Sequence, residues 1–292
     1  MRCYACPRQC GAERTENTPS AGFCKMPYNA VLARAALHHW EEPPLSAHGG
    51  AGAVFFSGCS LRCVFCQNHA ISHENFGKPV TIDRFIEILK ALEAAGAQNI
   101  DLVNPTHFAP FLQEALTRYK PRVPVVYNTG GYDTVETLKS LSGLVDIYLP
   151  DFKYMSETLA RRYSAAPDYP ERAKAALLEM RRQTRDRFAD DGRMLSGLLV
   201  RHLVLPQGTK DSAEILRWIA ENLSKDTYVS LMCQYTPGDR TYTHKALNRR
   251  LTTAEYDRVL RVFFNLGLHN GFMQARDSAD ARFTPAFDLT GV

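Results

Sequence analysis

Three cysteines lie close together, at Cys59, Cys63 and Cys66, in the stretch FFSGCSLRCVFCQN that spans residues 55–68. Their spacing, CxxxCxxC, places three thiols on one short loop. Three thiolates can hold three irons of a [4Fe–4S] cluster, and the fourth iron then stays open to a ligand that is not protein. An open coordination position distinguishes a reactive metal site from a structural one. The alternative is a zinc knuckle completed by a distant ligand such as His69, and the spacing favours the cluster.

Four further cysteines lie at the start of the chain, at Cys3, Cys6, Cys10 and Cys24. The short gap between Cys3 and Cys6 lets both chelate one ion from a tight turn. Four thiolates suit tetrahedral zinc or a closed iron–sulfur cluster. We expect a second, closed site that holds zinc or a single iron rather than a second [4Fe–4S] cluster. Such a metal would stabilise a segment that has little hydrophobic core of its own.

The composition is that of an ordinary globular protein. Of 292 residues, 45% are hydrophobic and 23% are charged, and the net charge is +4. That mild balance, without clustered basic residues, makes nucleic acid an unexpected partner. The N-terminus lacks an apolar signal region, and no apolar run is long enough to cross a membrane. We therefore expect a cytoplasmic protein with reduced cysteines, divided into a cysteine-rich module at 1–50 and one large domain at 51–292.

The large domain alternates between apolar runs and helical periodicity. Continuous apolar runs predict strands at 53–58, 99–105, 123–131, 145–153, 198–206 and 227–235, with a short last strand at 271–274. Amphipathic patterns predict helices at 81–96, 107–119, 134–141, 212–223 and 252–266, and a helical region reaching about residue 187 that is interrupted near 167–170. Alternating strands and helices of this kind predict a parallel sheet covered by helices.

Six strand–helix units are fewer than the eight of a closed barrel, so an open partial barrel or a doubly wound sheet would fit. In both folds the ligand site lies at the carboxyl ends of the strands. Polar residues follow most of the predicted strands at this point: Ser57, Asn104, Asn128, Thr129, Asp151, Lys153, Gln234 and Tyr235. Although turn residues are often polar, their recurrence at one edge of the sheet favours a shared pocket. Cys233 and His38 are open cases: each could face this pocket or have only a structural role.

Several stretches together resemble the radical S-adenosylmethionine (SAM) superfamily, in particular the enzymes similar to pyruvate formate-lyase activating enzyme. The resemblance is carried by SGCSLRCVFCQN, NIDLVNPTHFAP, VVYNTGGYD, VDIYLPDFKY and RHLVLP. It implies a partial (β/α)6 barrel, a [4Fe–4S] cluster and S-adenosylmethionine as cofactors. In such enzymes the reduced cluster cleaves S-adenosylmethionine to methionine and a 5′-deoxyadenosyl radical, which abstracts a hydrogen atom from the substrate.

The resemblance also implies roles for single residues. Phe65, just before the last cysteine of the loop, would pack beside the adenine. Asn104 stands where many relatives carry a Gly-Gly-Glu motif that holds the methionyl amine, so this contact is altered here. Asn128 and Thr129 resemble the Asp-Thr-Asn-Gly stretch of the activating enzymes, near the ribose.

Asp151 and Lys153 match the Asp-Leu-Lys stretch of those enzymes, and the Lys153 ammonium would pair with the methionyl carboxylate. Asp151 and Lys153 could instead be a charge pair at the start of a helix. His202 is a candidate neighbour of the adenine or ribose, although a strand histidine of this kind is often a hydrogen-bonded core residue.

The substrate is not specified by the sequence. The resemblance suggests an electron donor such as flavodoxin or ferredoxin, and a glycyl-radical protein, a peptide or a small molecule as the molecule acted upon. A different class of function is a non-enzymatic iron–sulfur or zinc protein that binds a partner or nucleic acid. The polar strand ends favour the enzyme.

Overall fold

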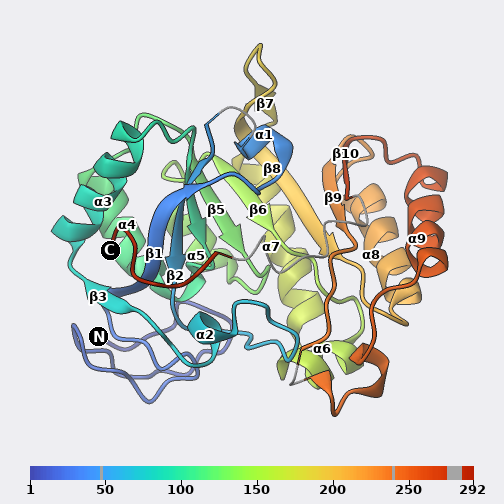
Figure 1. Ribbon diagram of the computed structural model, residues 1–292, viewed down its shortest axis with the longest axis horizontal. Coiled ribbons are helices and arrows are strands. Elements are labelled where there is room, and N and C mark those ends of the chain that lie inside the picture. Colours follow the sequence, from blue (N-terminus) through green and yellow to red (C-terminus); the bar gives the residue numbers. More distant parts are fainter. Residues whose placement is uncertain (47–48, 239–240, 275–284) are drawn as a thin grey trace.

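The computed structural model describes residues 1–46, 49–238, 241–274 and 285–292, and a largely parallel sheet lies at its centre (Figure 1). Its strand order is β10-β9-β8-β6-β5-β4-β2-β1-β3, and β7 pairs with β8 outside this path. The parallel strands are β2 (Ala51–Phe56), β4 (Ile100–Val103), β5 (Val125–Thr129), β6 (Ile147–Pro150), β8 (Met194–Leu203), β9 (Tyr228–Met232) and β10 (Gly271–Met273). The predicted α/β class is confirmed.

Helices connect the parallel strands. In chain order they are α2 (His69–Ser72), α3 (Ile82–Ala94), α4 (Ala109–Arg118), α5 (Val135–Ser140), α6 (Glu157–Ser164), α7 (Tyr169–Gln183), α8 (Thr209–Asn222) and α9 (Thr253–Asn265), with short turns α1 (Pro43–Ser46), η1 (Thr106–Phe108) and η3 (Lys245–Leu247). Figure 1 shows α3 and α4 beside one half of the sheet and α8 and α9 beside the other. The strands β3 and β10 end the sheet without pairing to each other, as expected of a partial (β/α)6 barrel.

Local sequence explains where these helices begin. The Thr81 side chain accepts the Arg84 amide at 3.2 Å and caps α3, whose buried face carries Phe85, Ile88, Leu89 and Leu92. Thr252 and Glu255 form a capping box at the start of α9. The predicted interruption near 167–170 is the junction between α6 and α7, where Ala165 adopts a left-handed conformation.

Two strands at one edge were not expected from the sequence. β1 (Ala30–His38) pairs antiparallel with both β2 and β3 (Lys78–Val80). The sheet therefore begins at residue 30, within the segment assigned to the cysteine-rich module, and the division into two domains stays a prediction. The long helical region also ends earlier than expected, at Gln183, because β7 (Arg187–Phe188) forms a hairpin with β8.

The first 29 residues contain no helix or strand, only an isolated bridge between Arg2 and Glu13. Arg8 attaches this segment to the body: its guanidinium donates to the carbonyls of Ser60, Ser164 and Ala165 at 2.5–2.9 Å. The N-terminal segment therefore packs directly against the three-cysteine loop. Within the described ranges, no helix combines the length and the apolar character needed to cross a bilayer.

Candidate active site

The three-cysteine loop follows β2 and is anchored on both sides. Gly58 has a φ of +79°, a left-handed conformation, and a Cβ there would collide with the Met26 side chain. The Gly58 amide donates to the Ile71 carbonyl at 2.8 Å. Burial lowers the pKa of His107 to about 3, so its neutral ring donates from Nε2 to the Ser57 carbonyl at 2.7 Å. These contacts fix the loop as it leaves the sheet.

Each of the three sulfur atoms accepts a hydrogen bond from the protein. Ser164 Oγ donates to Cys63 Sγ at 3.0 Å, and Ser72 Oγ donates to Cys66 Sγ at 3.3 Å. Cys59 Sγ accepts the backbone N–H two residues further along, at 3.3 Å. Burial raises the pKa of Cys63, and it raises the pKa of Cys66 to about 11. Bound iron would displace the thiol protons, and these donors would then stabilise the thiolates, so the donor set suits an iron–sulfur cluster.

All three cysteines line one cavity of about 230 Å³. The opposite walls are the carboxyl ends of the parallel strands: Val103, Asn104, Asn128, Thr129, Gly130, Asp151, Lys153, Arg201, Leu203, Met232, Gln234 and Tyr235. The structure thus brings together the loop cysteines, Phe65 and every sequence-predicted cofactor residue except His202. Their individual roles toward a cofactor stay predictions.

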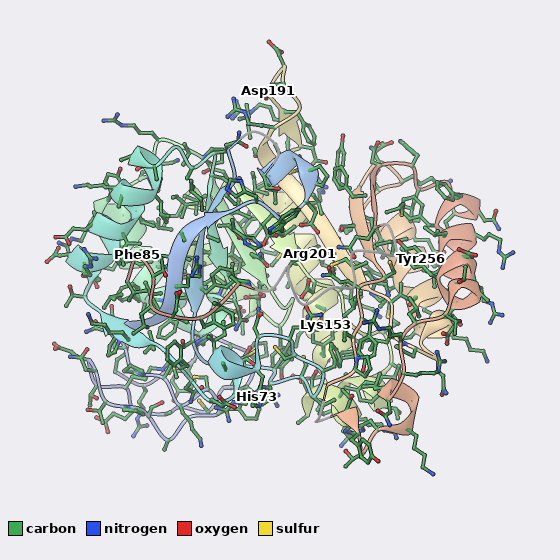
Figure 2. The ribbon with its side chains drawn as sticks, in the orientation of Figure 1. His73, Phe85, Lys153, Asp191, Arg201 and Tyr256 are labelled. Carbon is green, nitrogen blue, oxygen red and sulfur yellow. The ribbon has the colours of Figure 1, made fainter. Side chains whose placement is uncertain are left out.

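A carboxylate between two cations forms one wall of this cavity. Asp151 accepts from Lys153 Nζ at 2.5 Å and from Arg201 Nε at 3.0 Å, and both cations are labelled near the centre of Figure 2. Burial alone would raise the pKa of Asp151, but the two cations together hold it below its ordinary value. Burial opposes the charge on Lys153, yet the Asp151 carboxylate raises its pKa. Lys153 therefore remains charged in a half-buried position, as an anion-binding group requires.

Asn128, at the end of β5, connects the buried Asp101 carboxyl group to the Arg201 guanidinium. Its Nδ2 donates to Asp101 Oδ2 at 3.2 Å, and its Oδ1 accepts from Arg201 Nη2 at 2.5 Å. Both polar ends of the amide are thus satisfied within the protein, which fixes its orientation.

Thr129 is held by a buried carboxyl group. Its hydroxyl donates to Asp133 Oδ2 at 2.7 Å, while Thr106 and Tyr127 donate to Asp133 Oδ1 at 2.8 and 2.9 Å. Asp133 is 1% exposed. This network, formed by the loop that follows β5, positions the strand end rather than offering a free group to the cavity.

Asn104 and Phe65 line the cavity from two sides. Asn104 has a φ of +59°, its amide donates to the Asn128 carbonyl at 2.7 Å, and its Nδ2 donates to the Gly58 carbonyl at 3.1 Å. It therefore joins the end of β4 to the three-cysteine loop. The Phe65 ring lies edge-on to the rings of Tyr154, Tyr163 and Tyr235, which form an aromatic wall beside the loop.

His202 lies outside the cavity. Its Nδ1 pairs with the Phe152 carbonyl at 2.7 Å and its Nε2 with Ser212 Oγ at 2.8 Å. Burial lowers the pKa of His202 to about 4. Because side chains alternate along a strand, the neighbouring Arg201 faces the cavity instead. Arg201 was not predicted from the sequence, although LLVRHLVLP places Arg201 and His202 on opposite faces of the strand and one of them must face the cavity.

A second cavity, of about 380 Å³, adjoins the first, and both are lined by Gln67, Asn68, Val103, Asn128, Arg201, Met232 and Gln234. Glu41 and Glu42, which lie between β1 and α1, reach it, and so does His38. Neither glutamate was predicted from the sequence to lie at the site. Cys233 is absent from both cavities: it lines a separate pocket beside α9, and its thiol donates to the Gln274 carbonyl at 3.5 Å.

The four N-terminal cysteines line a small cavity of about 10 Å³ together with Arg8, Gln9, Arg14, Phe23 and Ser60, among other residues. Burial raises the pKa of Cys24, and it raises the pKa of Cys6 to about 12. Arg14 Nη2 donates to Cys24 Sγ at 3.1 Å. Among the described residues, no three metal-binding side chains converge as ligands of one ion, so the thiols would have to turn inward to bind a metal.

Comparison with known proteins gives a family match. A family model described as the Radical SAM superfamily matches residues 53–219. An uncharacterized protein of Methanocaldococcus jannaschii, MJ0674, is 29% identical over 278 residues, which are 91% of this chain and 76% of that protein.

Two solved structures of SuiB share the fold at low sequence identity. SuiB of Streptococcus suis bound to S-adenosylmethionine is matched over 75% of this chain and 48% of SuiB, with 13% identity and a TM-score of 0.50. SuiB bound to the precursor peptide SuiA gives 12% identity and the same TM-score, over 75% of this chain and 47% of SuiB. The chain thus spans about half the length of SuiB. A domain of a pyruvate-formate lyase-activating enzyme from Bacteroides vulgatus matches 59% of this chain and 91% of that domain, with 11% identity and a TM-score of 0.39.

Proposed function

The chain belongs to the radical SAM superfamily, and from this premise we propose that it uses a cluster held by Cys59, Cys63 and Cys66 to cleave S-adenosylmethionine reductively. The observation that carries the proposal is that these cysteines share one cavity with Asp151 and Lys153. A structural metal site would close on protein ligands, whereas this cavity leaves room beside the thiols.

The chain's own residues have distinct tasks in this proposal. When bound, the reduced [4Fe–4S] cluster and S-adenosylmethionine supply a 5′-deoxyadenosyl radical that can abstract a hydrogen atom. The three thiolates hold the cluster, and the serine hydroxyls tune them. Lys153, kept charged by Asp151, pairs with the methionyl carboxylate. Phe65 and its aromatic neighbours exclude water on the side of the adenine.

The molecule acted upon is either a protein, as in glycyl-radical activation, or a smaller substrate. SuiB has been solved with a precursor peptide, which makes peptides one class to test. Flavodoxin or ferredoxin is the proposed electron donor.

Anaerobic reconstitution with iron and sulfide tests the proposal. With dithionite and S-adenosylmethionine, we expect the protein to form 5′-deoxyadenosine, and Cys63→Ala to abolish it. Cys233→Ala is the matched control because that thiol lines neither of the two central cavities. A reducible cluster that yields no 5′-deoxyadenosine would favour a non-enzymatic metal protein, and full activity of Cys63→Ala would refute the three-cysteine assignment.

The N-terminal cysteines are proposed to hold one zinc or iron ion, supported by their shared small cavity. Metal analysis of the Cys59/Cys63/Cys66 triple alanine variant isolates this site. We expect about one metal ion per chain, lost when Cys3 and Cys6 are also replaced. Retention of four irons in the triple variant would instead assign a second cluster.

A further inference from the structure

The second cavity is continuous with the proposed radical site, so a molecule inside it would lie next to the cofactors. The two cavities share seven lining residues, contributed by four parallel strands and the three-cysteine loop. A volume of about 380 Å³ is within the range of small-molecule sites. On the proposed function, this is where the substrate would have to lie.

The floor of this cavity carries more acid than base. Glu41 and Glu42 line it, and Arg201 is its sole Lys or Arg side chain within the described part of the chain. The Arg201 guanidinium is already engaged by the protein: Nε by Asp151, Nη2 by Asn128, and Nη1 by Glu41 at 3.4 Å.

Glu42 is the less compensated of the two glutamates. It is 8% exposed, and no Lys or Arg nitrogen lies within ion-pair distance among the described residues, although Arg201 and the Ser230 hydroxyl are its favourable neighbours. His38, which also lines this cavity, adds no positive charge at neutral pH because burial lowers its pKa.

A third carboxyl group lies beneath the floor. Asp101 is fully buried and, two residues before Val103 on β4, faces the same side as that cavity-lining residue. Its Oδ2 accepts from Asn128; its Oδ1 meets no donor among the described residues, and the Glu41 carboxyl group lies close enough to share a hydrogen bond with Asp101. Burial and the nearby Glu41 raise the pKa of Asp101 well above its ordinary value. A carboxyl group that shares a proton with the neighbouring Glu41 adds acid to this side of the cavity and brings no positive charge to it.

We infer that the second cavity is the substrate pocket and that it recognises a cationic nitrogen, alkylammonium or guanidinium, bound by the carboxylates of Glu41 and Glu42. This inference rests on the proposed function. The carbon chain attached to that nitrogen would extend toward the three-cysteine loop along Val103 and Met232, which line both cavities. An anionic group at the same place would meet the two glutamates and be rejected.

Binding of simple probes to the reconstituted protein with S-adenosylmethionine tests this directly. The probes are n-butylammonium, n-butylguanidinium, neutral butyramide and anionic butyrate, compared by isothermal titration calorimetry at mildly alkaline pH, above the pKa of about 7 to which burial raises Glu42, so that Glu42 is ionised. We expect at least one of the two cations to bind at least about tenfold more tightly than butyramide, a factor equivalent to about 1.4 kcal/mol, and butyrate not to bind. Equal affinities, preference for butyrate, or no binding of either cation would each overturn the inference.

A pair of variants assigns the binding to this pocket. Glu42→Gln keeps the shape and removes the charge, so we expect the preference for a cation over butyramide to fall about tenfold. Glu221→Gln, on the exposed face of α8, removes the same charge elsewhere and should leave the preference unchanged. Unchanged preference in Glu42→Gln would refute the assignment. The wild-type probe series stands without either variant should one fail to fold.

Two further measurements distinguish a peptide substrate from a small amine and test the pocket separately from the proposed function. N-acetyl-Gly-Lys-Gly-amide carries the same ammonium on a peptide whose ends are uncharged: tighter binding than n-butylammonium indicates a peptide substrate, and weaker binding indicates a small amine. Both outcomes support a cation site. Formation of 5′-deoxyadenosine by the wild-type protein is measured in parallel. If it forms while no cation binds, the pocket inference fails and the proposed function stands.

Discussion

Arg201 on β8 donates a hydrogen bond from Nε to Asp151 Oδ1 at 3.0 Å, which joins the carboxyl ends of two neighbouring strands beside the three-cysteine loop. The same guanidinium also contacts Asn128 and Glu41. One side chain therefore links the wall of the cofactor cavity to the floor of the second cavity. The geometry of both depends on a single half-buried cation.

Replacing Arg201 should therefore destabilise the fold as well as the site. In Arg201→Met the carboxylates of Asp151 and Glu41 lose their shared cation, and we expect the free energy of unfolding to fall by about 3–5 kcal/mol. Urea denaturation of the metal-free protein measures this. Arg193→Met breaks the more exposed pair with Asp191 and should cost less than about 1 kcal/mol. Equal losses in the two variants would contradict the central role of Arg201.

Gly131 should tolerate no side chain. Its φ is +76°, and a Cβ would collide with the Asp151 carbonyl oxygen. Gly143 has nearly the same φ, +79°, but a Cβ there meets no atom within 4 Å. We expect Gly143→Ala to cost about 1–2 kcal/mol from the left-handed conformation alone. Gly131→Ala should cost about 1–3 kcal/mol more, because the strand end must shift. Similar unfolding free energies for the two variants would show that the approach of Gly131 to Asp151 is not constrained.

The hydrogen bond from Ser164 to Cys63 should set the reduction potential of the proposed cluster. A donor to a ligating sulfur stabilises the more negative, reduced state, so removing it lowers the potential. For Ser164→Ala we expect a decrease on the order of 40 mV, which corresponds to about 1 kcal/mol for one electron. Potentiometric titration followed by electron paramagnetic resonance measures it. Ser140→Ala removes a hydroxyl that bonds only a helix carbonyl and is the matched control. An unchanged or higher potential in Ser164→Ala would contradict this role.

The six strand–helix units were predictable because buried parallel strands read as continuous apolar runs and their helices as amphipathic ones. The strand ends, and with them Asn128, Asp151 and Lys153, followed from that pattern. β1 was not predictable because AVLARAALH is rich in alanine and becomes a strand through its pairing with β2.

The acidic floor was hidden for a related reason. Glu41 and Glu42 reach the second cavity because β1 pairs with β2. That pairing cannot be predicted from the local sequence around either strand. Whether Arg201 or His202 faces the cavity depends on the strand register, because a shift of one residue would exchange the two faces of β8. Sequence patterns located the edge of the sheet where the site lies, and tertiary pairing decided which side chains complete it.

Glu42 should give the protein a distinctive pH dependence. Burial raises its pKa from an ordinary value of 4.5 to about 7, only partly opposed by Arg201. Between these values Glu42 is deprotonated in the unfolded chain and protonated in the folded protein. The stability contributed by the protonated Glu42 is therefore complete below pH 4.5 and is lost as the pH rises through about 7. Glu42→Gln cannot ionise. From acidic to mildly alkaline pH, its unfolding free energy should therefore rise relative to wild type by up to about 3 kcal/mol. Urea titrations of the metal-free proteins across this range measure the difference, and Glu221→Gln should give a constant one. A difference for Glu42→Gln that stays constant or falls with pH would mean that Glu42 is already ionised in the folded protein, with its charge balanced by Arg201.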